Sequence, residues 1–115
     1  MSRSDVLIIE DEAAQAEALA VVCQRLGASA KLCASATSGL RELSGSAFKL
    51  VILDLGLPDR NGLSVLEEIN KLNLRPAVLI ITAHGTLRNA VAARQLGSAG
   101  YLVKPLDLPD LERTL

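Results

Sequence analysis

Hydrophobic residues gather along the chain in four short continuous runs and one weaker run. The strong runs are DVLIIE (5–10), KLVILD (49–54), PAVLIIT (76–82) and GYLVKP (100–105), and the weaker run is SAKLCA (29–34). The segments 50–53 and 78–81 are apolar without alternation, which is typical of strands covered on both faces. The pattern therefore predicts five short strands, at least two of them buried on both sides.

Between these runs, apolar residues recur at helical spacing. One face is formed by Ala16, Leu19, Ala20, Cys23 and Leu26, with Gly27 as a helix stop, and a second by Leu63, Leu66, Ile69 and Leu72. The alanine-rich segment 86–97 predicts a helix that ends at Gly97, and the segment 35–45 a short one. A last helix is expected from Asp107, which can cap it, through Leu115.

Strand and helix thus alternate about five times, which indicates an α/β fold with a parallel, doubly wound sheet and helices on both faces. A length of 115 residues suits one domain, expected over 1–115. The last predicted helix reaches the end of the sequence without a cap. We take this as an expectation that it is truncated and that any output domain is absent.

Composition narrows the function classes. A formal net charge of -1 gives no reason to expect direct nucleic-acid binding, and no apolar run is long enough for a membrane span. Aromatic residues are scarce, with one Phe and one Tyr, which argues against base-stacking platforms. Cys23 and Cys33 lack metal-binding spacing, so we expect two reduced thiols in a cytoplasmic protein.

Polar residues end the strands on one side. The first predicted strand ends in Glu10, Asp11 and Glu12, and the third, fourth and fifth end in Asp54, Thr82 and Lys104. Each is unremarkable alone, since such an Asp is usually a turn former and EDE usually a solvated helix start. In open parallel sheets, however, functional groups gather beyond the carboxyl ends of the strands. We therefore expect these groups to meet on one rim.

Carboxylates placed together repel one another unless a cation neutralises them. Mg²⁺ is the natural candidate, because it prefers oxygen ligands and keeps several waters beside one or two carboxylates. A hydrated Mg²⁺ beside Asp54 and Lys104 can hold the oxygens of a phosphoryl group, and phosphoryl transfer is mostly positioning and charge stabilisation. The sequence thus predicts that Asp54 is a nucleophile that takes up phosphate as an acyl phosphate.

The segments VLIIEDE, VILDLGLPDRNGLSVLEEI, VLIITAHG and GYLVKPLD together resemble the receiver domain of two-component response regulators, over essentially the whole chain. The resemblance implies a five-stranded fold of flavodoxin-like topology. It implies that Asp54 accepts phosphate from a sensor histidine kinase or a phosphotransfer protein. It also implies that the domain is a phosphoprotein switch of a phosphorelay and not a conventional enzyme, although it can promote its own phosphorylation and dephosphorylation.

The resemblance also assigns roles to individual residues. Asp11 is implied as a direct Mg²⁺ ligand, Glu10 as one acting more through water, and Asp54 and the Gly56 carbonyl as further ligands. Thr82 is implied as the switch hydroxyl, Lys104 as the lysine that pairs with phosphate, and Tyr101 as the aromatic residue whose rotamer follows Thr82. The Lys104–Pro105 bond is expected to be cis. The last strand and the helices at 86–96 and 107–115 are the expected surface for a homodimer or partner.

Three alternatives remain beside this interpretation. A phosphatase of the haloacid-dehalogenase type also uses an Asp at a strand end, but it requires a second acid two residues later, where this chain has Gly56. A flavin or dinucleotide binder would carry GxGxxG after the first strand, where this chain has acids. A pseudo-receiver that interacts without phosphate would not need Asp11, Asp54, Thr82 and Lys104 together.

Overall fold

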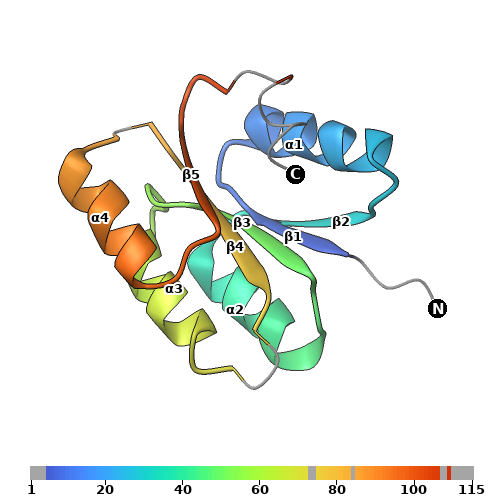
Figure 1. Cartoon of the computed structure of the whole chain (residues 1–115). Coiled ribbons are helices and arrows are strands. Elements are labelled where there is room, and N and C mark those ends of the chain that lie inside the picture. Colours follow the sequence, from blue (N-terminus) through green and yellow to red (C-terminus); the bar gives the residue numbers. More distant parts are fainter. Residues whose placement is uncertain (1–4, 73–74, 84, 107–108, 110–115) are drawn as a thin grey trace.

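Five parallel strands form one sheet that is covered by helices on both faces (Figure 1). The computed structural model describes residues 5–72, 75–83, 85–106 and 109. The elements are β1 (Val6–Ile9), α1 (Ala13–Arg25), β2 (Ala30–Cys33), α2 (Ala36–Gly45), β3 (Leu50–Asp54), α3 (Gly62–Ile69), β4 (Ala77–Thr82), α4 (Leu87–Gln95) and β5 (Gly100–Val103). The strand order is β2-β1-β3-β4-β5. The predicted doubly wound α/β fold is confirmed.

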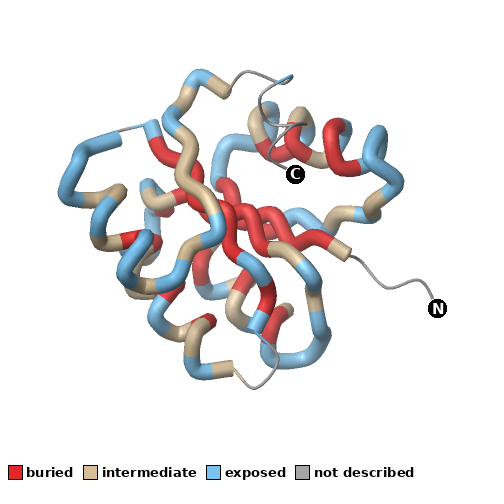
Figure 2. Tube along the Cα trace, viewed as in Figure 1, coloured by how far each residue is buried: buried red, intermediate tan, exposed pale blue. Residues whose placement is uncertain are grey.

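The sheet separates two hydrophobic cores. On one face, α1 packs on β1 and β3 through residues such as Leu19, Val22 and Ile8. On the other face, α2, α3 and α4 cover the sheet, with Ile9, Leu53 and other side chains between them (Figure 1). Figure 2 shows the result as a continuous band of buried residues along the central strands. Because β1, β3 and β4 are buried on both sides, the residues at their ends are held rigidly.

Several boundaries differ from the sequence prediction. Leu26, expected on the buried face of the first helix, lies just beyond α1 and is 51% exposed. The helix α3 ends at Ile69, and Leu72 packs on the core from the turn that follows. The helix predicted from Asp107 lies outside the described residues. Cys23 and Cys33 are buried free thiols, as expected, and burial raises the pKa of both.

No helix in the described part of the chain combines the length and the apolar character needed to cross a lipid bilayer.

The loop between β3 and α3 is pressed against the end of β3. The Gly62 N–H donates to the Leu55 carbonyl, and Asn61 caps α3 by accepting from the Leu63 N–H at 2.8 Å. A Cβ atom at Gly62 would lie 2.6 Å from the Leu55 Cα and 2.9 Å from the Asp54 carbonyl oxygen. Only glycine therefore allows α3 to begin this close to Asp54.

A carboxylate in the same loop holds α2 from the side. Asp59 accepts hydrogen bonds from the Thr37 N–H (2.9 Å), the Ala36 N–H (3.0 Å) and the Thr37 hydroxyl (2.8 Å). Two of these bonds satisfy free N–H groups at the start of a helix, where a negative charge is favoured. Donation from Thr37 and then from Ala36 lowers the pKa of Asp59 from 3.8 to about 2. Asp59 thus links the loop after β3 to the N-terminus of α2.

We expect the Asp59→Ala variant to melt at a lower temperature than the parent, by an amount that depends on pH. Because the folded-state pKa of Asp59 lies below its unfolded value, its contribution is complete above about pH 4. It is lost as the pH falls toward 2. Thermal melts monitored by circular dichroism between pH 7 and pH 2 should show the difference narrowing on acidification.

Glu67→Ala is the matched control for this experiment. Glu67 is an exposed acid on α3, so its replacement removes the same charge without those three hydrogen bonds. A difference between parent and Asp59→Ala that does not change with pH, or an equal loss in Glu67→Ala, would contradict the assigned role of Asp59.

Candidate functional site

The polar residues predicted to meet on one rim do meet there. Asp54 and Thr82 are the last residues of β3 and β4, while Glu10 and Lys104 directly follow β1 and β5. The register pairs Ile9 with Leu53, Asp54 with Ile81, and Thr82 with Val103. Adjacent strands therefore end at nearly the same level, and the side chains of Glu10, Asp54 and Lys104 come together.

Lys104 is the centre of this group. Its Nζ atom lies 3.0 Å from Glu10 Oε1, 3.2 Å from Asp54 Oδ2 and 3.3 Å from Glu12 Oε1. The side chains of Lys104, Asp54 and Glu10 are 11%, 5% and 0% exposed, whereas that of Glu12 is 66% exposed. One largely buried ammonium therefore joins two buried carboxylates and one solvated carboxylate.

The burial and the mutual contacts of these groups displace their pKa values. Burial, reinforced by the neighbouring Asp54, raises the pKa of Glu10 to about 7. Burial also acts to raise the pKa of Asp54, but Glu10, the Gly56 N–H and Lys104 outweigh it and lower that pKa below its ordinary value. The pKa of Lys104 is raised because Glu10 and Asp54 offset its burial. Asp54 and Lys104 are therefore ionised together near neutral pH.

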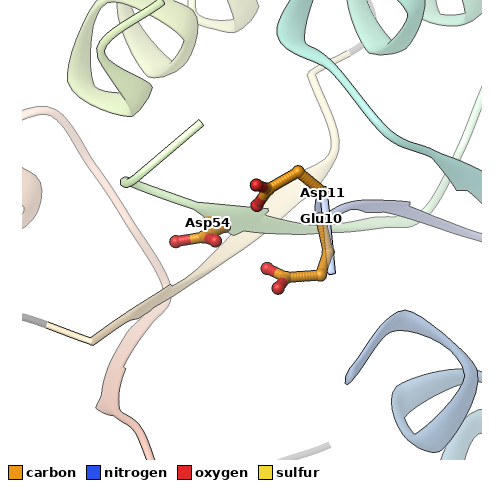
Figure 3. A group of neighbouring side chains, drawn as sticks. All are labelled: Glu10, Asp11 and Asp54. Carbon is orange, nitrogen blue, oxygen red and sulfur yellow. The ribbon is translucent and has the colours of Figure 1, made fainter. Parts of the chain in front are cut away.

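The predicted Mg²⁺ ligands lie close enough to share one cation. Carboxylate oxygens of Glu10, Asp11 and Asp54 all lie within 4.8 Å of one another, and the three side chains gather at the strand ends in Figure 3. Glu10 Oε2 is buried and has no hydrogen-bond partner among the described residues. A buried oxygen of this kind is costly unless a donor or a cation reaches it. The donor set and the unpartnered oxygen both fit a hard divalent cation such as Mg²⁺.

Gly56 lies beside the same carboxylate. Its N–H donates to Asp54 Oδ1 at 2.9 Å, which fixes the orientation of the Asp54 side chain. A Cβ atom at this position would meet only Asp54 Oδ1, at 3.6 Å, so the space beside the carboxylate is open. The implied role of the Gly56 carbonyl as a metal ligand stays a prediction.

Thr82 and Tyr101 occupy neighbouring strands behind the charged group. Thr82 is buried, and its carbonyl accepts from the Lys104 N–H at 2.7 Å. Tyr101 pairs with Ile80, packs against the core under α4, and buries its hydroxyl without a hydrogen-bond partner in the described part of the chain. Tyr101 is thus turned inward here. The Lys104–Pro105 peptide bond is cis, as the resemblance implied.

The sequence pattern predicts neither of two contacts in this part of the fold. Glu12 stands at the end of the first predicted strand without a predicted role, and it reaches the Lys104 ammonium from the start of α1. The bonds of Asp59 to α2 have no signal in the sequence. A run of three acids and an Asp in a Pro-containing loop are both common, so only the folded arrangement reveals these contacts.

Comparison with curated proteins finds transcriptional regulators. The chain is 32% identical over 111 residues to the transcriptional regulatory protein ZraR of Escherichia coli K12, which covers 96% of this chain and 25% of ZraR. The chain therefore spans about a quarter of the length of the first curated relatives it matches.

Comparison with solved structures finds receiver domains. A response regulator receiver domain protein from Clostridium thermocellum matches with a TM-score of 0.86 and 32% identity, covering 96% of this chain and 90% of that one. A response regulator protein from Burkholderia pseudomallei, solved with a phosphorylated aspartic acid, calcium ion and citrate, matches with a TM-score of 0.87 and 25% identity. That match covers 97% of this chain and 66% of the other.

The family model for the response regulator receiver domain matches residues 6–115. Proteins of that family interact with histidine kinases or phosphotransfer proteins and bind Mg²⁺ at an acidic pocket. The match spans nearly the whole chain, and the sheet order and the acidic rim agree with it. The chain therefore belongs to the receiver domains of two-component response regulators, which are phosphoacceptor signalling domains.

Proposed function

We propose that Asp54 is the residue that takes up the phosphoryl group. The observation that carries this proposal is the position of Asp54 Oδ2, 3.2 Å from the Lys104 ammonium and next to the carboxylates of Glu10 and Asp11. The lowered pKa of Asp54 keeps it ionised, as a nucleophile must be. The similar response regulator protein from Burkholderia pseudomallei was solved with a phosphorylated aspartic acid, and this supports the same chemistry for Asp54.

In the proposed transfer, an Asp54 oxygen attacks the phosphorus of a phosphohistidine on a sensor kinase or a phosphotransfer protein. The phosphorus–nitrogen bond breaks, the imidazole keeps its electron pair, and an acyl phosphate remains on Asp54. Lys104 pairs with one oxygen of the transferred group. Because positioning and charge stabilisation suffice for this chemistry, the same residues would let the domain use a small phosphodonor or lose its phosphate to water.

Glu10, Asp11, Asp54 and the Gly56 carbonyl are the groups that we propose hold Mg²⁺. When bound, Mg²⁺ supplies positive charge against the phosphoryl oxygens and offsets the repulsion among the carboxylates. Glu10 and Asp11 contribute this acidic pocket from the end of β1, while Asp54 contributes from β3.

Thr82 and Tyr101 form the proposed readout. A phosphoryl group adds a charge of about −1.5 to −2 and three acceptor oxygens, one of which the Thr82 hydroxyl can bind by reorienting. A cavity of about 190 Å³ beside Thr82 leaves room for movement; its lining is Leu55, Gly56, Asn61, Leu63, Thr82 and Asn89. Among the described residues the inward Tyr101 hydroxyl has no hydrogen-bond partner, and we propose that a small change in free energy shifts the population of its rotamers.

The proposed output surface lies on α4 and β5. Leu87 is 81% exposed, and Val91 and Val103 are also exposed large hydrophobic residues on these two elements. Val103 pairs with Thr82 across the sheet, so this surface is directly connected to the proposed switch. We propose that phosphorylation strengthens binding of a second copy or a partner here, and that the domain works in the cytoplasm, where Cys23 and Cys33 stay reduced.

Phosphate uptake should require Asp54. Incubation with a small acyl-phosphate donor and Mg²⁺ should add one phosphoryl group, about 80 Da, to the parent protein and none to Asp54→Ala. Intact mass spectrometry of freshly treated protein measures this. Asp59→Ala is the control: it replaces a different Asp, five positions after Asp54, and should still take up phosphate. Substantial uptake by Asp54→Ala would refute the assignment.

Mg²⁺ binding should require Asp11. In a titration followed by amide chemical shifts, the residues near 10–12 and 54–57 should move in the parent. Asp11→Ala should weaken the affinity by about tenfold or more, since a metal site loses affinity on that scale when even its supporting groups are removed. Glu17→Ala is the control, because Glu17 is an exposed acid on α1 outside the carboxylate cluster. Equal affinities of Asp11→Ala and Glu17→Ala would show that the ligand set is wrong.

The Thr82 hydroxyl should couple phosphate to Tyr101. Thr82→Ala, phosphorylated at Asp54, should lose the phosphate-induced chemical-shift changes at Tyr101 and the increase in association seen by sedimentation. Thr82→Ser retains a hydroxyl and should restore both effects. If Thr82→Ala responds to phosphate as the parent does, the signal reaches β5 by another route.

A further inference from the structure

Glu12 departs from the ordinary behaviour of a helix-capping residue. It stands at the N-cap of α1 in an extended conformation, yet its side chain makes no cap hydrogen bond. The side chain is directed instead to Lys104, with Oε1 3.3 Å from Nζ, across 92 residues of sequence. It remains 66% exposed to solvent. Glu12 is therefore a solvated residue that contacts the largely buried ammonium of Lys104.

The contact with Glu12 matters because Lys104 has a limited number of hydrogen-bond donors. A lysine ammonium has three N–H donors and no acceptor. In this structure three carboxylates lie within reach of them, those of Glu10, Asp54 and Glu12. The ammonium is thus saturated with acceptors. A phosphoryl oxygen on Asp54 can pair with Lys104 only if one of these acceptors gives way.

The three acceptors differ in how readily they can be released. The Glu10 side chain is fully buried, and its other oxygen already lacks a hydrogen-bond partner among the described residues. Releasing Glu10 would separate a buried ion pair, which costs more than separating an exposed one. Asp54 keeps its contact with Lys104 through Oδ2 when the phosphoryl group is carried on Oδ1. Glu12 is solvated, so water can replace Lys104 with little loss.

We propose that Glu12 is a displaceable acceptor that occupies one N–H of Lys104 in the unphosphorylated domain and releases it to the phosphoryl oxygen. This inference rests on the proposed role of Asp54 and adds a positioning residue to it. Glu12 holds Lys104 in place when no phosphate is present. It also opposes the phosphorylated state, because it competes with the phosphoryl oxygen for the ammonium.

The test is a titration with beryllofluoride, a mimic of the phosphoryl group, at saturating Mg²⁺, followed by the amide shifts of residues 54–57. Glu12→Ala should bind the mimic about threefold more tightly, as expected from removing one exposed ion pair. Glu12→Gln keeps a weaker, neutral acceptor and should fall between the parent and Glu12→Ala. Glu17→Ala removes the same charge elsewhere on α1 and should match the parent.

A second readout separates this role from a structural one. Because Glu12 makes no cap hydrogen bond, all variants should keep the melting temperature of the parent, and their Mg²⁺ affinities should match that of Glu17→Ala. Affinity for beryllofluoride in Glu12→Ala that equals or falls below that of the parent would overturn the inference. Equal tightening in Glu12→Ala and Glu12→Gln would also overturn it, since charge alone would then be the cause.

Beryllofluoride binding distinguishes an error about Glu12 from an error about Asp54. If the parent binds beryllofluoride but Glu12→Ala gains nothing, only the role of Glu12 is wrong. If the parent shows no binding at the residues around Asp54, the proposed phosphoacceptor site and the role of Glu12 are both wrong.

Discussion

The pairing of the Lys104 ammonium with buried carboxylates is the interaction on which the site depends. Lys104 contacts Glu10, which lies 94 positions away in the sequence, and Asp54, which lies 50 positions away. Removing one partner of a buried ion pair typically costs about 3–5 kcal/mol, because the other charge is left uncompensated. Replacing a whole buried pair by hydrophobic residues is often neutral or stabilising. We therefore infer that the chain keeps this cluster for chemistry rather than for stability.

The order of the strands brings these charges together. β3 lies between β1 and β4, and β5 is next to β4, so Asp54 is flanked by the end of β1 on one side and Thr82 on the other. The change of direction in strand order between β1 and β3 is the position where open α/β sheets form their functional crevice. The hydrophobic cores on both faces hold the strands in register, and they thereby fix the geometry of the polar rim.

The sequence predicts most of this arrangement because it depends on backbone topology. Continuous apolar runs mark buried strands, and parallel strands must place their last residues on one rim, so the meeting of Glu10, Asp54, Thr82 and Lys104 follows from the order of elements. The edge strand β2 gives a weaker pattern, since Lys31 and Leu32 are exposed there. The contacts of Glu12 and Asp59 depend on side-chain directions across a distance of many residues, and no local pattern encodes them.

The charged site and the apolar surface are connected by β5 and by the residue that directly follows it. Tyr101, Val103 and Lys104 place an aromatic ring in the core, a hydrophobic side chain on the surface and an ammonium at Asp54, within four positions. The Lys104 N–H also binds the Thr82 carbonyl at 2.7 Å, which ties the end of β5 to the end of β4. A change in what Lys104 pairs with therefore acts on the strand that carries both Tyr101 and Val103. Since α4 packs on β5, coupling from the charged pocket to the exposed face needs no long pathway through the core.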